Sequence, residues 1–288
     1  MAWLSIITVL ALGSGALLRN SPLLYQTMPP ETDQPWADQP MRLDDLFTTA
    51  ATHMALLHNS LIRGYNSIHL QAPHVRDADK PDFLAYTRTW LRFIRSHHDD
   101  EDEILFPELR SALGDDSVWG DVPQEHETLV RGLDDLGRYL DSLSNASALT
   151  STALLAVLDH LHQPLEHHLH HEVAVMAAMA THPNVPSPDS LEGSVAAAML
   201  KAWGKNTVRK AGLADVVPLF LLNADRTAEK GMWHNWPPMP RPVRWAMVNV
   251  VGAIHGSRWR FASCDGNGRP RRLYALAAAE SSQKDGEL

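Results

Sequence analysis

Two His-x-x-x-Glu pairs are the residues of this sequence best suited to chemistry. His97 precedes Glu101 by four positions, and His168 precedes Glu172 by the same spacing. Residues four apart lie on one face of an α-helix, so each pair would present an imidazole beside a carboxylate. Nitrogen and oxygen ligands without thiolate suit iron or manganese. The chain has 16 histidines but a single cysteine, Cys264, which excludes a cysteine-based zinc or iron–sulfur site and a disulfide framework.

The apolar pattern around these pairs decides which of them face a protein core. His162 and Glu166 show the same spacing as His168 and Glu172, so spacing alone does not identify a site. In residues 149–180 a stripe of leucines at helical spacing turns polar at His168 and Glu172. Burying an imidazole and a carboxylate is costly unless something coordinates them, so the pattern favours this pair over His162 and Glu166. The leucines of the stripe are Leu154, Leu158, Leu161 and Leu165.

Residues 80–113 show the same arrangement independently. His97 and Glu101 continue an apolar stripe of this segment, whereas the register through His98 includes Arg95. We therefore expect His97 and Glu101 to point inward, with His98 as the nearest substitute. The stripe consists of Phe83, Trp90, Ile94 and Leu105.

Two further helical segments each place one histidine on an apolar face. His58 shares a face with Phe47, Met54 and Leu61 in residues 43–70. His126 shares a face with a row of leucines in residues 122–144, namely Leu129, Leu133, Leu136 and Leu140. Each predicted helix thus contributes one interior histidine, and two of the helices add a carboxylate.

Four helices with short connections predict an all-α, antiparallel up-down four-helix bundle. The bundle core would then hold six nitrogen and oxygen ligands, a recognised way to build a dinuclear metal centre. Zinc is normally satisfied by four ligands, and no His-Glu-x-x-His motif is present, so we expect a di-iron centre. The predicted metal ligands are His58, His97, Glu101, His126, His168 and Glu172.

The predicted ligands lie in four stretches: HNSLIRGYNSI (58–68), HHDDEDEILFPEL (97–109), the QEH that contains His126, and HLHHEV (168–173). Over residues 43–180 these stretches resemble the hemerythrin-like HHE cation-binding domain. The resemblance implies the same six ligands, with Glu101 and Glu172 as bridging carboxylates. It also implies iron as the metal and O2 as its ligand or co-substrate.

Two positions depart from the family pattern. The family often has a second acid where Asp102 stands, and the oxygen-carrying hemerythrins have a further histidine where this chain has Val130. One fewer protein ligand leaves one more open position on iron, which argues against simple reversible oxygen carriage.

The ends of the chain resemble fungal hemerythrin-like proteins that have an apolar N-terminus and a C-terminal extension similar to WRFASCDGNGRPRRL (259–273). This resemblance implies a non-heme di-iron oxidase or oxygenase that oxidises a small organic molecule in a fungal natural-product pathway. The electron donor is not indicated by the sequence. The alternative is a non-catalytic protein that binds, stores or senses iron or O2.

Charge divides the chain into two regions. Of the net charge of −9, residues 1–190 contribute 11 basic and 26 acidic side chains, and residues 191–288 contribute 14 and 8. The basic region has no Lys/Arg cluster interleaved with aromatics, so we expect no nucleic-acid partner and expect its charge to face the acidic region. The predicted organisation is an apolar segment (1–19), a Pro-rich linker (20–41), the bundle (42–183) and a basic, Trp-rich extension (184–288).

The apolar N-terminal segment predicts a membrane anchor. Residues 2–18 carry no charged side chain, and the length of this uncharged segment is at the lower limit for a membrane-spanning helix. A cleaved signal, leaving a secreted or soluble protein, is the second reading, and a buried core helix is the third.

The C-terminal extension is less informative. Residues 196–210 and 243–254 predict two helices, and DGNG (265–268) predicts a turn. Four tryptophans crowd this region and either line a substrate entrance over the bundle or form ordinary core. They are Trp233, Trp236, Trp245 and Trp259.

Overall fold

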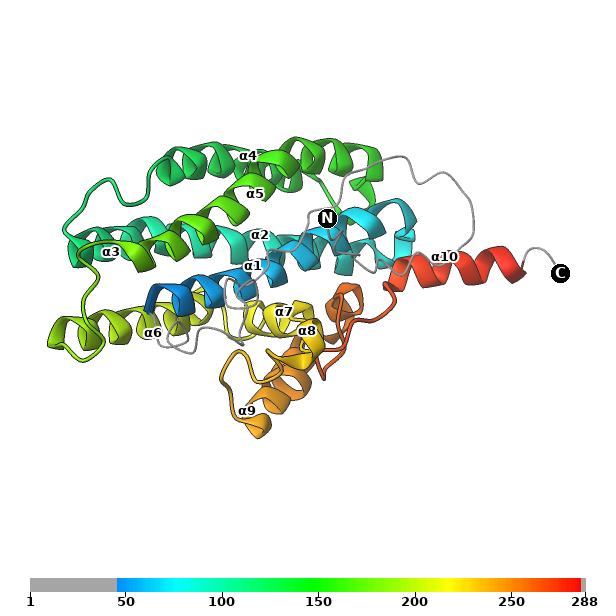
Figure 1. The fold of residues 1–288 in the computed structure, drawn as a ribbon. Helices are drawn as coiled ribbons and strands as arrows, with labels where there is room; N and C mark the ends of the chain where they lie inside the picture. Colours follow the sequence, from blue (N-terminus) through cyan, green and yellow to red (C-terminus); the bar gives the residue numbers. More distant parts are fainter. Residues whose placement is uncertain (1–45, 286–288) are drawn as a thin grey trace, which may run out of the picture.

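Four long helices form the bundle that the sequence predicts. They are α1 (Leu46–Gln71), α2 (Lys80–Asp100), α4 (Val122–Ser142) and α5 (Ser151–Ala178) (Figure 1). The computed structural model describes residues 46–285, and no strand occurs within that range. Helices α4 and α5 pack on each other and cover α2 and α1, respectively. The predicted all-α four-helix bundle is confirmed.

Helix α2 continues through a wider turn into a third piece of helix. A π-helical segment, Glu101–Leu105, joins α2 to α3 (Phe106–Leu113). Such segments accommodate an extra residue in a turn and are frequent at functional sites. The segment begins at Glu101, one of the predicted ligands. Gly114 then ends α3 in the left-handed conformation at φ 60°, which glycine adopts without steric cost.

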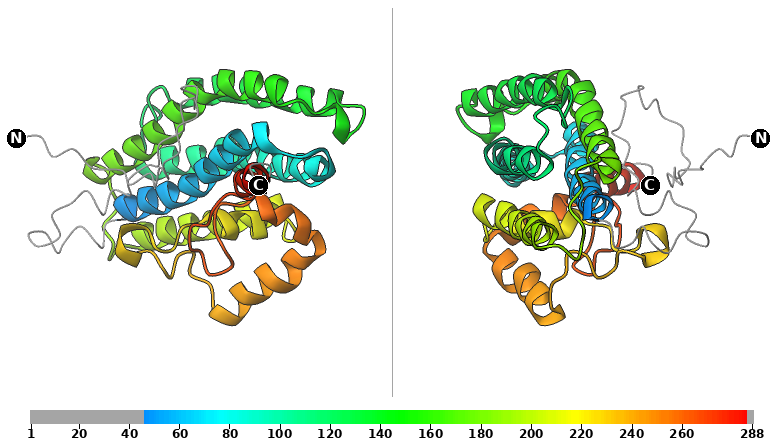
Figure 2. Two further views of the ribbon diagram at one scale, coloured as in Figure 1. Left: turned by 90° about the vertical axis from the view of Figure 1, so that its right-hand side faces the viewer. Right: turned by 60° about the vertical axis from the view of Figure 1, so that its left-hand side comes forward.

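The C-terminal extension adds a third layer. Helices α6 (Leu191–Ala211) and α7 (Val216–Asn223) lie against α1 and α2 on the side away from α4 and α5 (Figures 1 and 2). Helix α6 corresponds to the predicted helix 196–210. Helix α7 was not predicted: its eight residues, VVPLFLLN, are all buried, so they show no apolar periodicity that would mark an amphipathic helix.

The rest of the extension is more broken than the sequence predicts. Residues 243–254 do not form one regular helix, because α9 (Arg241–Ala246) passes into a π-helical segment, Met247–Val251, and a 3-10 segment, Gly252–Phe261. The predicted turn at 265–268 is present, and the Asp265 carboxylate accepts a backbone hydrogen bond from Asn267 at 2.8 Å. Two further helices are α8 (Ala228–Gly231) and α10 (Tyr274–Asp285).

Helices α1 and α2 therefore have two buried faces, one toward the bundle core and one toward the extension. On α1, the Ser60 hydroxyl donates to the backbone oxygen of Phe220 at 3.0 Å. Ion pairs also join the basic extension to the acidic bundle, as expected from the charge division. Lys210 lies 2.7 Å from Asp100, and Arg260 lies 3.0 Å from Asp79. The division into domains near residue 183 stays a prediction.

The predicted membrane anchor is corrected. Among residues 46–285, no helix is long and apolar enough to cross a membrane. Residues 2–18, on which the prediction rested, lie outside the described part of the chain.

Candidate metal centre

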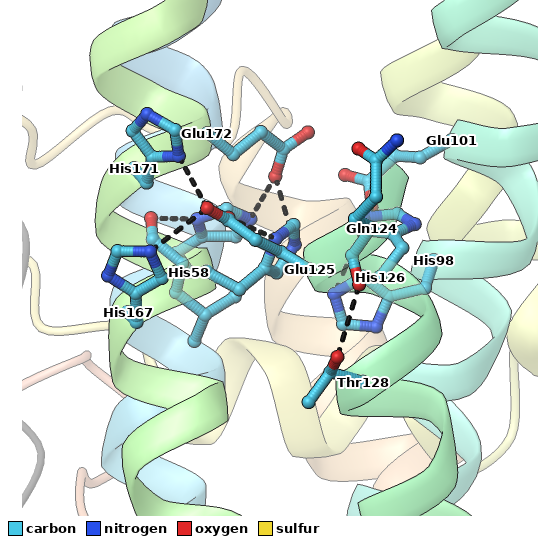
Figure 3. Close-up of polar contacts among 12 residues, drawn as sticks. His58, His98, Glu101, Gln124, Glu125, His126, Thr128, His167, His171 and Glu172 are labelled. Atoms are coloured by element: carbon cyan, nitrogen blue, oxygen red, sulfur yellow. Dashed lines mark hydrogen bonds and ion pairs between the residues drawn. The ribbon is translucent and has the colours of Figure 1, made fainter. Parts of the chain in front are cut away.

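All six residues that the sequence singled out lie together in the middle of the bundle. Each is at most 2% exposed. They come from four helices and the π-helical segment: His58 from α1, His97 from α2, Glu101 from the π-helical segment, His126 from α4, and His168 and Glu172 from α5. Figure 3 shows the carboxylates of Glu101 and Glu172 among the imidazoles.

One side of this cluster is formed by His58, His97 and Glu101. The Nε2 atoms of His58 and His97 are 3.0 Å apart, and Nε2 of His97 is 3.0 Å from Oε1 of Glu101. Ligand atoms of these three residues lie within 4.8 Å of one another. Two imidazole nitrogens so close to a carboxylate oxygen are suited to hold a cation between them.

The other side of the cluster contains His98, which the sequence pattern predicts only as an alternative to His97. His98, His126, His168 and Glu101 also have ligand atoms within 4.8 Å of one another. The ring centroid of His98 is 4.7 Å from that of His126 and 5.0 Å from that of His168. Its side chain is 1% exposed, so His98 belongs to the buried cluster together with His97.

Each carboxylate reaches histidines on both sides of the cluster. Oε1 of Glu101 faces His97, whereas its Oε2 lies 3.5 Å from Nε2 of His126. Oε2 of Glu172 lies 3.5 Å from Nε2 of His58 and 3.6 Å from Nε2 of His168. This arrangement suits carboxylates that bridge two metal ions.

The chemistry of the buried atoms fits a metal. Buried polar side-chain atoms are normally hydrogen-bonded, and each one left without a partner costs on the order of 1–3 kcal/mol. In this cluster many have none: Nδ1 of His97, both ring nitrogens of His98 and His168, Nε2 of His126, and both oxygens of Glu101 and Glu172. Coordination would satisfy several of these atoms at once.

Burial also holds the histidines in the protonation state that binds metals. Removal from water lowers the pKa of His97 to about 3 and that of His168 to about 4, although Asp100 and Glu125, respectively, oppose the shift. Burial raises the pKa of Glu101 to about 8, and the pKa of Glu172 is also well above its ordinary value. His97 and His168 are therefore neutral, as metal ligands must be, and the two carboxyls without a cation prefer to keep a proton.

Outer contacts orient three of the imidazoles. Nδ1 of His58 hydrogen-bonds to the backbone oxygen of Leu169 at 2.9 Å, and Nδ1 of His126 lies 3.1 Å from Oδ1 of Asp102. Nδ1 of His168 faces Oε2 of Glu125 at 3.5 Å. In each case the opposite nitrogen, Nε2, points into the cluster, as in the carboxylate– and carbonyl–histidine pairs of metal sites.

The other His-x-x-x-Glu pair, His162 and Glu166, lies outside the buried cluster. His162 stands 3.6 Å from Glu166 and packs against Tyr65, with ring centroids 6.2 Å apart. It is in neither of the ligand groups described above. His168 belongs to one of those groups, and Glu172 lies 3.6 Å from its Nε2; that these two residues are metal ligands stays a prediction.

The tryptophan that lies over the cluster is Trp203, which is not among the four tryptophans named above. Trp203 of α6 has its ring 6.0 Å from that of His97 and donates from Nε1 to the backbone oxygen of Asp100 at 3.2 Å. By contrast, Trp259 is buried core and Trp245 is 60% exposed. The sequence does contain a signal for Trp203, namely its helical spacing from two apolar residues. It lies four residues after Met199 and three after Leu200, and all three are partly buried in one cluster.

Two cavities lie at a distance from these side chains. One, of about 510 Å³, opens beside α3 at Pro107 and Arg110. The other, of about 30 Å³, lies between α1 and the extension at Arg63, Asp225 and Trp236. No residue of the cluster lines either cavity.

Comparison with known proteins gives two matches. Residues 49–180 match the profile of the family described as Hemerythrin HHE cation binding domain. A dimeric xanthone biosynthesis cluster protein from Cryptosporiopsis sp. (strain 8999) is 31% identical over 237 residues, covering 81% of this chain and 85% of that protein. No solved structure matches significantly.

Proposed function

This chain belongs to the hemerythrin-like HHE cation-binding family, and from that premise we propose that its bundle holds two iron ions with which it binds and activates O2. The observation that carries the proposal is the buried cluster of imidazole and carboxylate groups, in which most of the atoms that could bind a metal have no hydrogen-bond partner. Nitrogen and oxygen ligands of this kind suit iron.

We assign the two sides of the cluster to two ions. His58 and His97 would hold one ion, and His98, His126 and His168 the other. Glu101 and Glu172 would bridge them, because each carboxylate lies near histidines of both sides. His98 is then a seventh ligand. It would take the place of the further histidine that oxygen-carrying hemerythrins have at the position of Val130, which in this chain is 36% exposed.

The protein's own residues prepare the centre for oxygen chemistry. Iron, when bound, supplies the electrons that reduce O2. Burial holds His97 and His168 neutral by lowering the pKa of each. Leu169, Asp102 and Glu125 orient three of the imidazoles, and Trp203 helps to keep bulk water away. A catalytic cycle needs an external electron donor.

The relative supports a biosynthetic role. Its name places that protein in a gene cluster for dimeric xanthones. The similarity extends over 81% of this chain, which is more than the bundle alone and so includes part of the extension. We propose that the substrate is a small organic molecule of the xanthone type and that the reaction is an oxidation by O2.

A second function is favoured by the burial of the centre. The predicted ligands are at most 2% exposed, and neither cavity described above reaches them. A substrate larger than O2 would require movement of α6 and Trp203. A non-catalytic protein that binds iron or O2 needs no such movement, so it is the alternative to the oxidase.

Single-turnover reactions separate the two functions. The protein is loaded with ferrous iron without oxygen, mixed with a xanthone-type phenol, and exposed to O2, while product is followed by mass spectrometry. An oxidase yields oxidised product in proportion to the loaded iron, and a variant carrying both His97→Ala and His168→Ala yields none. Uptake of O2 with the phenol unchanged would reject the oxidase and favour the binding protein.

A further inference from the structure

A second group of metal-binding side chains lies at the surface, outside the buried cluster. His167 and His171 are one helical turn apart on α5, and Glu125 is in the first turn of α4. Figure 3 shows both imidazoles pointing at the Glu125 carboxylate. Two histidines at i and i+4 form a recurrent pair of metal ligands on one helix face.

The three side chains converge on one point. Nε2 of His167 is 2.9 Å from Oε1 of Glu125, and Nδ1 of His171 is 2.7 Å from the same oxygen. The two imidazole rings are stacked, with centroids 5.5 Å apart and 24° between their planes. One ligand atom from each residue lies within 4.8 Å of the others.

The spacing suits a cation after a small adjustment. Four ligands at about 2.1 Å from a tetrahedral ion lie about 3.4 Å from one another. The two nitrogens must therefore move less than about 1 Å away from the oxygen. His167 is 62% exposed and His171 38%, so both can move without disturbing the core.

Glu125 links this surface group to the buried one. Its Oε1 faces the two exposed imidazoles, whereas its Oε2 is buried without a hydrogen-bond partner and lies 3.5 Å from Nδ1 of His168. The carboxylate itself is only 14% exposed. The carboxylate is thus mostly buried, and its outer oxygen, Oε1, faces the two imidazoles.

We propose that Glu125, His167 and His171 form a second, mononuclear site for a divalent cation such as Zn²⁺ or Fe²⁺, at the surface beside the buried centre. Two imidazoles and one carboxylate are ligands for cations of this class, and water completes the coordination. Because the site is half-exposed, its cation exchanges with solution, unlike ions in the buried cluster.

Zinc binding tests the site. The iron-loaded protein, with its metal content measured first, is dialysed against Zn²⁺ at neutral pH. We expect one additional Zn²⁺ per chain, which is lost in a variant with both His167→Gln and His171→Gln. A control with His74→Gln and His160→Gln, which removes two exposed histidines elsewhere, should keep it.

Two outcomes would overturn the proposal. One is that the wild type takes up no additional Zn²⁺, as expected if the imidazoles only form ion pairs with Glu125. The other is that the His167/His171 variant keeps it. Circular dichroism and iron content verify that this variant is folded with its centre intact. Because the readout is the difference in bound zinc between the wild type and this variant, which share the same buried cluster, it is independent of whether that cluster holds iron.

Discussion

His98 lies against His126, with ring centroids 4.7 Å apart and 82° between the ring planes. Both ring nitrogens of His98 are buried and lack hydrogen-bond partners. An imidazole in that position serves no packing purpose that an apolar side chain would not serve better. We therefore regard His98 as a ligand of the second ion.

Replacement of His98 tests that role. We expect His98→Ala to retain one tightly bound iron ion, held on the side of His58 and His97, and to lose most of the other. Iron content and the visible spectrum after exposure to air measure this loss. His162→Ala is the matched control, because His162 is buried outside the cluster. Unchanged iron content in His98→Ala would show that the residue is not a ligand.

Asp102 is expected to act through His126. Its Oδ1 lies 3.1 Å from Nδ1 of His126, so the carboxylate fixes the ring and makes Nε2 a better ligand. We expect Asp102→Asn to weaken iron binding about 10- to 100-fold, as found for outer partners of metal ligands. Competition with a chelator measures the affinity. Glu127→Gln removes an exposed carboxylate next to His126 and should have no effect; equal weakening in both variants would point to overall charge instead.

Trp203 is expected to slow access to the centre. Its ring covers His97 from α6, and its Nε1 hydrogen bond to Asp100 fixes it there. We expect Trp203→Ala to release iron to a chelator faster than the wild type, while Trp203→Phe, which keeps an aromatic ring, stays closer to the wild-type rate. Equal release from all three proteins would mean that access takes another route.

Metal-free protein should be most stable in mildly acidic solution. The pKa of Glu101 is raised from 4.5 to about 8, so stability present below pH 4.5 is lost as the pH rises toward 8. The pKa of His97 is lowered from 6.5 to about 3, so stability present above pH 6.5 is lost as the pH falls toward 3. Between pH 6.5 and 8 only the carboxyl effect operates, and one group changes stability by about 2 kcal/mol.

Urea unfolding at pH 6.5 and 8 measures this effect. We expect chelator-treated protein to be less stable at pH 8, and iron-loaded protein to show little or no such loss, because the metal binds the ionised carboxylates. If both forms lose the same stability, the buried carboxyls are not the cause.

The bundle and most of its centre could be predicted because their signals are local. A leucine stripe that turns polar at His168 and Glu172 shows in one helix which polar groups are buried. The sequence pattern favours His97 over His98 because an amphipathic helix is expected to have a single inward face. The extension gives α2 two: His97 faces Trp203 of α6, while His98 faces His126.

The remaining differences also come from long-range packing. Helix α7 is buried on all sides, so its residues carry no periodic pattern. Arg95, which argued against the register of His98, is partly exposed at the edge of the bundle and pairs with Asp134 at 2.6 Å. A charged residue on a partly buried face is visible in the sequence, but the partner that makes it acceptable lies 39 positions away.

Iron content per chain tests the dinuclear centre most directly. Protein loaded with ferrous iron without oxygen, freed of excess metal and then exposed to air should contain about two iron ions per chain and show the visible bands of an oxo-bridged iron pair. The variant with His97→Ala and His168→Ala should lose both signals. Less than about one iron per chain, with no such bands in the wild type, would contradict the account.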